Sequence, residues 1–210
     1  MNRNTLKLLG VAAVAVAVVG TGLTVSLSSQ ATAEAAVSVP PIGTICVKPA
    51  NMVHTFNPAG TFGGPVATTN GSISAQVGQR ITTSDGRTGF NFAVVSFISN
   101  GFVQGLGNVS ITLDTSRRPS ASTFISNSPQ AKELTDPEGN TQRINFFINV
   151  DIDGQKFRSE SQVTLLSTSV QDFPPPPGTV YELASPARLL DSTGKAAFVL
   201  PAGYAAKISG

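Results

Sequence analysis

From Gly43 onward the chain is a series of short apolar and polar alternations separated by Gly, Asn, Asp and Pro. Alternation with a period of two is typical of a β-strand, because successive side chains point to opposite faces of a sheet. No window shows a sustained 3.6-residue apolar period, and the best helical candidate, residues 129–135, is long enough for about two turns. The pattern predicts an all-β protein.

One hairpin is predicted residue by residue from Asp153-Gly154, a favoured pair for a two-residue type I′ turn. The turn fixes the register, and the register sorts the two strands into an apolar face and a polar face, with opposite charges opposite each other near the turn. The predicted pairs are Ile152 with Gln155, Asp151 with Lys156, Val150 with Phe157, Asn149 with Arg158, Ile148 with Ser159, Phe147 with Glu160, Phe146 with Ser161, Asn145 with Gln162 and Ile144 with Val163.

A second turn is predicted at Asn100-Gly101, between strands 90–99 and 102–113. Both stripes of 90–99 are largely apolar, which indicates a central strand covered on two sides. Pro174–Pro177 is predicted to form a crossover, since proline has no N–H to donate to a central strand. Further short strands are predicted at 73–77, 109–113, 180–183, 187–190, 196–200 and 204–208. Strands of this length and spacing favour a single antiparallel β-sandwich-like domain over residues 43–210.

The N-terminus has the pattern of a secretory signal peptide. Arg3 and Lys7 precede an apolar run over 8–19 and a stretch of small residues that ends in Ala31-Thr32-Ala33. We expect residues 1–33 to be the signal peptide, with cleavage after Ala35 or Ala36 as alternatives, and 34–42 to be an extended linker or arm. The alternative is an uncleaved membrane anchor, since the segment from residue 6 to 27 is long enough to span a bilayer. Either way the sequence predicts a secreted or extracytoplasmic protein of the bacterial export type.

The net charge of the chain argues against a nucleic-acid partner. Arg3 and Lys7 account for the excess of 14 basic over 12 acidic residues, so the chain after residue 33 is electrically neutral. Binding to a nucleic acid normally needs a basic face, and the only basic pair is Arg117-Arg118. We therefore expect no nucleic-acid partner, and a membrane partner only if the signal segment stays uncleaved. A single cysteine, Cys46, forms no intrachain disulfide and is expected to pack as a small apolar residue.

Candidate chemistry is sparse. His54, the only histidine, lies in a polar stretch that predicts a solvated loop, and one His with one Cys does not complete a zinc site. Asp151 and Asp153 are explained by the hairpin. The alternation Asp136, Glu138, Asn140 departs from a calcium-loop pattern because Gly139 precedes Asn140, and it indicates an acidic surface loop. The sequence marks no catalytic, cofactor-binding or metal-binding residue.

Three functions remain open. The first is a non-catalytic binding or structural module of the cell envelope or extracellular space, whose partner is an unknown macromolecule or envelope component. The second is a carrier of a small apolar ligand, which needs an internal cavity among the phenylalanines. The third is a secreted hydrolase that uses carboxylates or His54. A sugar-binding module is disfavoured, because the chain has no Trp and its twelve Phe are expected in the core.

Overall fold

The computed structural model describes residues 39–129 and 139–209. This part of the chain is all β, and it forms no helix that is long and apolar enough to cross a membrane. The helical candidate at 129–135 falls almost entirely on residues 130–138, outside the described residues. The strands are β1 (Ile45–Thr55), β2 (Asn57–Pro58), β3 (Val66–Thr82), β4 (Thr88–Val103), β5 (Gly107–Leu113), β6 (Ser122–Ser126), β7 (Asn140–Phe146), β8 (Ile148–Ile152), β9 (Gln155–Ser159), β10 (Val163–Val170), β11 (Val180–Leu183), β12 (Ala187–Leu190), β13 (Ala196–Leu200) and β14 (Gly203–Ile208).

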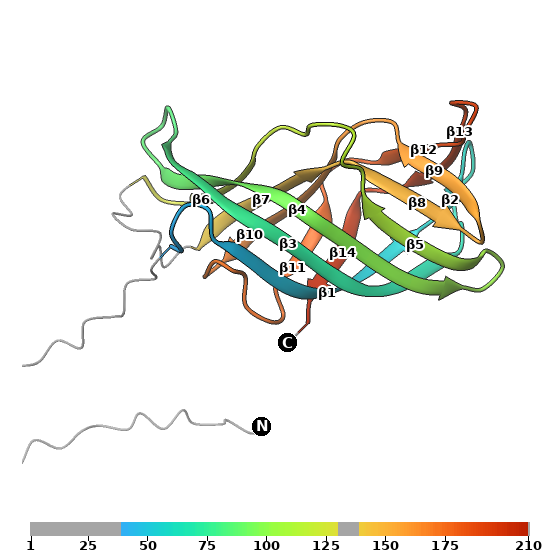
Figure 1. The fold of residues 1–210 in the computed structure, drawn as a ribbon, viewed down its shortest axis with the longest axis horizontal. Coiled ribbons are helices and arrows are strands. Elements are labelled where there is room, and N and C mark those ends of the chain that lie inside the picture. The colour runs from blue at the N-terminus through green and yellow to red at the C-terminus, as the bar shows by residue number, and fades with distance from the viewer. Residues whose placement is uncertain (1–38, 130–138, 210) are drawn as a thin grey trace, which may run out of the picture. The chain divides into compact units, whose positions relative to one another are not determined.

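The strands form a closed antiparallel barrel with an extension, where a sandwich was predicted (Figure 1). The ring runs β4-β3-β1-β14-β11-β10-β7-β6, and β6 closes it by pairing with the first half of β4. The closing pairs join Gly89 to Ile125 and Phe92 to Ser122. Strand β6 is therefore paired on both sides, with β4 and with β7. Closure removes the open edges that each sheet of a sandwich would keep.

The extension begins at the second half of β4, which pairs with β5 where β6 has ended. From there the order is β5-β8-β9-β12-β13-β2. Strand β2 pairs with β13 and is the last strand of the extension. In the sequence it follows β1 after the single residue Phe56, so the far end of the extension is joined directly to a strand of the barrel. Strand β4 is therefore shared by the barrel and the extension, and β3 pairs with it along its length. This explains why both strands are far longer than the usual five or six residues.

A β-bulge at Val95 reverses the facing of β4 halfway along its length. Ala75 pairs with Val94 and Ser74 pairs with Ser96, which leaves Val95 as the extra residue. Phe90, Phe92 and Val94 face the interior before the bulge, and Phe97 faces it afterwards. Both stripes of this strand look apolar in the sequence because each faces the core for half of the strand. The predicted two-sided burial is thus wrong: Val95 and Ile98 are exposed.

Asn100-Gly101, predicted as a turn, lies inside β4, and the chain reverses at 104–106 instead. A Cβ on Gly101 would lie 2.5 Å from the carbonyl oxygen of Thr68, and one on Gly71 would lie 1.8 Å from that of Ile98. The glycine is needed here for close approach of two strand backbones rather than for a turn. The buried hydroxyls beside these glycines satisfy each other, with Ser99 Oγ donating to Thr69 Oγ1 at 2.6 Å.

The Asp153-Gly154 hairpin is confirmed near its turn and wrong further out. Asp153 and Gly154 have φ of 49° and 86°, and the four pairs from Ile152–Gln155 to Asn149–Arg158 are as predicted. Beyond them Val163 pairs with Phe146 rather than with Ile144, because two extra residues enter between β9 and β10. Where the predicted register ends, the hydroxyl oxygen of Ser159 accepts a hydrogen bond from Ile148 N at 3.2 Å in place of a backbone carbonyl.

The connection between β10 and β11 contributes an aromatic side chain to the barrel core. Phe173 contacts the rings of Phe90, Phe124 and Phe92 at centroid distances of 4.8, 5.6 and 5.4 Å. The prolines after it lie outside the strands, as predicted. The core therefore includes a residue from a loop.

Candidate functional site

A transverse row of polar side chains crosses the outer face of the sheet. One residue from each of seven neighbouring strands lies in register, and all seven are exposed or half-buried. At about 4.8 Å per strand the row spans about 29 Å. In spatial order the residues are Lys207, Asn51, Asn70, Asn100, Ser110, Asp151 and Lys156.

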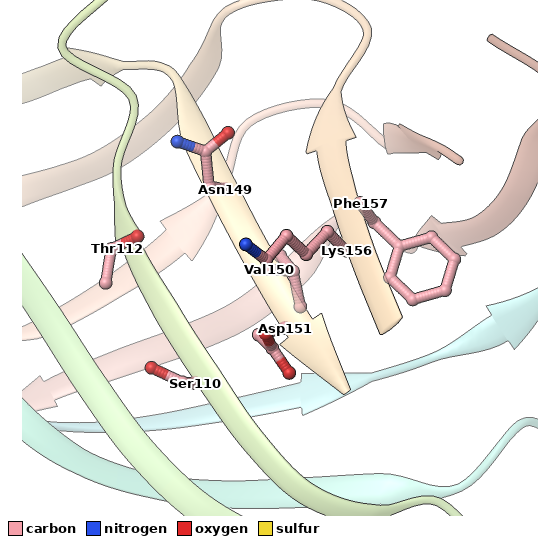
Figure 2. A pocket seen from close by; sticks show the side chains of 7 residues that line it. All are labelled: Ser110, Thr112, Asn149, Val150, Asp151, Lys156 and Phe157. Carbon is pink, nitrogen blue, oxygen red and sulfur yellow. The ribbon is translucent and has the colours of Figure 1, made fainter. Parts of the chain in front are cut away.

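The half of this row on β4, β5, β8 and β9 is hollowed into two adjoining concavities, of about 550 and 270 Å³. They share Ser110 and Asp151. The polar side chains of the larger one come from β5, β8 and β9. In Figure 2 the ring of Phe157 points away from them. We call this region the polar trough. Its polar side chains are Asn100, Asn108, Ser110, Thr112, Asn149, Asp151, Asp153 and Lys156.

Most polar groups of the trough have no partner within the described chain. The one hydrogen bond of a trough side chain that the described residues show joins Gly154 N to Asp151 Oδ1, at 2.8 Å. Asp151 and Lys156 are directly opposite each other in the register, yet they form no ion pair among the described residues. Amides, hydroxyls, a carboxylate oxygen and an ammonium group are thus available to a ligand.

Two exposed apolar side chains flank the row on β4. Ile98, which is 43 % exposed, precedes Asn100 by two residues, and Phe102, which is 67 % exposed, follows it by two. The same outward face carries Thr112 opposite Ile98 and Asn108 opposite Phe102. The trough therefore offers hydrogen-bonding groups with an aromatic ring at one border.

The ion pair of Asp114 and Arg117, by contrast, serves the fold. Asp114 is buried, and Arg117 reaches it through Nε at 3.0 Å while its guanidinium lies 3.9 Å from the ring centre of Phe147. The Ser116 hydroxyl above all, then the Ser116 amide and Arg117, hold the pKa of Asp114 below its ordinary value against the opposing effect of burial. Arg117 also donates a hydrogen bond to the carbonyl oxygen of Ser159, so it attaches the connection between β5 and β6 to β9.

His54 is a buried residue of β1 and not the solvated loop histidine predicted from sequence. It is 9 % exposed, and its Nε2 has no hydrogen-bond partner among the described residues. It lines a cavity of about 10 Å³ whose other lining residues are all apolar, and it meets the ring of Phe56 edge-on at 6.3 Å. Burial lowers the pKa of His54 to about 4. No nucleophile or carboxylate lines this cavity in the described part of the chain.

The barrel interior holds a second small cavity, of about 20 Å³, that is lined mainly by apolar side chains. Cys46 and Lys48 face it from β1, and burial raises the pKa of the Cys46 thiol. Tyr181 donates a hydrogen bond of 2.5 Å to Gln142 Oε1 beside it, and burial raises the pKa of the Tyr181 hydroxyl as well. Phe173 and the following prolines form part of its wall.

The sequence places Asn149, Asp151 and Lys156 on the polar side of one hairpin and Asp153 in its turn, and it assigns none of them to a site. The sequence does not predict that these residues lie beside Asn100, Asn108, Ser110 and Thr112, because it gives no sign that β5 pairs with β8. Of the acidic loop, Asp136 and Glu138 lie outside the described residues. Across 39–129 and 139–209, no three His, Cys, Asp or Glu residues are grouped so that they could hold a metal ion.

No protein-family model and no curated protein matches this chain. Among solved structures it is similar to DynF from the dynemicin biosynthesis pathway of Micromonospora chersina. The TM-score is 0.64, with 17 % sequence identity over 91 % of this chain and 93 % of that one. The likeness shows that the two chains share a fold.

Proposed function

We propose that this is an extracytoplasmic binding protein that holds a polar component of the cell envelope or extracellular space in the polar trough, without chemical turnover. The observation that carries the proposal is a concavity of about 550 Å³ whose polar side chains have free hydrogen-bonding capacity. Its lining residues are Ser110, Thr112, Asn149, Asp151 and Lys156, together with the apolar Val150 and Phe157. That volume lies within the range of about 300–1,000 Å³ that is usual for ligand sites. Export is expected from the signal pattern at 1–33.

The sheet geometry supports binding by side chains rather than by strand addition. Strands β4, β5 and β8 are paired on both sides along the trough, so their backbones have no free row of N–H and C=O groups there. A partner that adds a β-strand needs such a free edge. On these three strands the ligand therefore contacts the outward side chains, and their chemistry sets its class. Strand β9 pairs with β12 only at Arg158 and Ser159, so residues 155–157 keep a free backbone edge at the end of the trough.

Co-sedimentation with the insoluble envelope fraction of the producing organism tests this function. We expect the wild-type protein to be retained and the double variant Asn149→Ala/Lys156→Ala to bind about tenfold more weakly, since it loses about 1.4 kcal/mol of contacts. The matched control, Gln171→Ala/Lys195→Ala, removes the same two kinds of group at exposed positions outside the trough. Equal retention of the two variants, or no retention of the wild type, would contradict the proposal.

A second candidate function is carriage of a small apolar ligand inside the barrel. Its support is the apolar cavity beside Phe173, a residue that enters the core from a loop. An eight-stranded barrel is wide enough for one small ligand. The present volume of about 20 Å³ holds no more than a water molecule, so a ligand would have to displace Phe173.

Mass spectrometry of an organic extract tests the carrier. The protein is isolated from its native culture medium or envelope, washed, and extracted, and an apolar compound present at about one per chain is expected if the barrel carries cargo. Its amount should fall in the Ile144→Trp variant, which fills the cavity that Ile144 lines. An extract free of such a compound would reject this candidate and leave the polar trough unaffected.

A further inference from the structure

Building on the proposed function, we infer that the ligand of the polar trough is a neutral, hydroxyl-rich glycan chain. The first step is the kind of group present. Asn100, Asn108 and Asn149 each offer both a donor and an acceptor, and Ser110 and Thr112 do the same through their hydroxyls. A sugar hydroxyl also donates and accepts at once, so such a surface satisfies it in either direction.

The charges of the trough disfavour a polyanion. Asp151 and Asp153 contribute two carboxylates, and Lys156 contributes the one ammonium group among the trough side chains. A phosphate-rich or sulfate-rich polymer needs several Lys or Arg residues to offset its charge. Carboxylates instead accept hydrogen bonds from hydroxyl groups, and charge-assisted bonds of this kind are the stronger ones. The balance fits a chain that is polar and uncharged.

Phe102 supplies the remaining element of sugar recognition. It is 67 % exposed, although phenylalanine side chains are usually buried and most in this chain are. It lies on the outer face next to Asn108 and two residues from Asn100. An aromatic face is electron-rich and attracts the C–H groups of a sugar ring, while the hydroxyls at the ring edge turn to the polar side chains. This exposed ring overturns the expectation that the phenylalanines would all be in the core.

The length and regular spacing of the row suit a linear polymer. Beyond the trough it continues through Asn70 and Asn51 to Lys207, with one polar side chain per strand. A polymer lying across the strands meets a new hydrogen-bonding group about every 4.8 Å. The glycan therefore extends from the trough over β3 and β1.

Selective destruction of the envelope fraction tests the ligand class. Periodate cleaves the vicinal diols of glycans, and protease digests proteins. We expect retention of the wild-type protein to be lost after periodate treatment and kept after protease treatment. Retention that survives periodate but not protease would overturn the glycan and leave trough binding intact. Retention that never depended on Asn149 and Lys156 would reject the proposed function itself.

Two single variants address the exposed ring. Phe102→Ala should weaken retention on the untreated fraction about tenfold. Its control, Phe62→Ala, removes a ring that is 99 % exposed and lies outside the trough, so it should leave retention unchanged. The thermal unfolding midpoints of both variants, measured alongside, show whether each folds like the wild type. Unaltered retention of a folded Phe102→Ala protein would remove the ring from the site.

Discussion

Replacing Phe157 with alanine is expected to lower the free energy of unfolding by about 3–5 kcal/mol, the usual cost of truncating a buried Phe. Phe157 lies on the apolar side of β9, opposite Val150, and its ring meets that of Phe198 edge-on at 5.2 Å. The substitution removes this contact and leaves a cavity in the core of the extension. Urea unfolding at equilibrium measures the change.

The neighbouring residue is the control. Arg158 is exposed on the other side of the same strand, opposite Asn149. Arg158→Ala should change the free energy of unfolding by no more than about 0.5 kcal/mol, as surface substitutions usually do. Comparable losses in the two variants would mean that β9 is turned over or out of register, because a slip of one residue exchanges the two faces.

The part of the fold that the sequence predicts well is the part that local contacts decide. The turn at Asp153-Gly154 determines its own register, because both residues adopt positive φ and the flanking faces sort cleanly. The short strands from 180 to 208 were also predicted within one residue of their ends. In these segments alternation, turn residues and burial all agree.

The predictions that failed needed information from distant strands. The alternation does not reveal the bulge at Val95, because both stripes of side chains along β4 contain apolar residues. Asn-Gly favours a turn, but at 100–101 a glycine is required because a Cβ there would clash with the carbonyl oxygen of Thr68 on the neighbouring strand. Barrel closure depends on the pairing of β4 with β6, and a sandwich with the same strands would have the same alternation.

The candidate site was half predictable for the same reason. The hairpin put Asn149, Asp151 and Lys156 on one polar face. That face becomes a site only because Ser110 and Asn100 come into register with it from β5 and β4. His54 was misread because its neighbours in sequence are polar. Its neighbours in space, which come from distant strands such as β7, β8 and β10, are apolar.

Acidification from pH 7.5 to pH 4 is expected to lower the free energy of unfolding by about 3 kcal/mol through His54 alone. Burial lowers the pKa of His54 to about 4 in the folded protein, whereas the unfolded chain has an ordinary value of about 6.5. Between these values the unfolded state binds more protons, so stability falls as the pH falls. Below pH 4 the folded state is protonated too, and the loss stops growing.

The His54→Leu variant isolates this effect. Leucine is similar in size and suits the apolar cavity, and it removes the unpartnered Nε2. At pH 7.5 the variant should be at least as stable as the wild type. At pH 4 it should be more stable by about 3 kcal/mol, because carboxylates such as Asp114 titrate equally in both proteins and cancel in the comparison. Urea unfolding at pH 7.5, 6, 5 and 4 gives the two curves. Parallel curves would show that His54 is hydrated or paired in solution, and that the core around it is open to water.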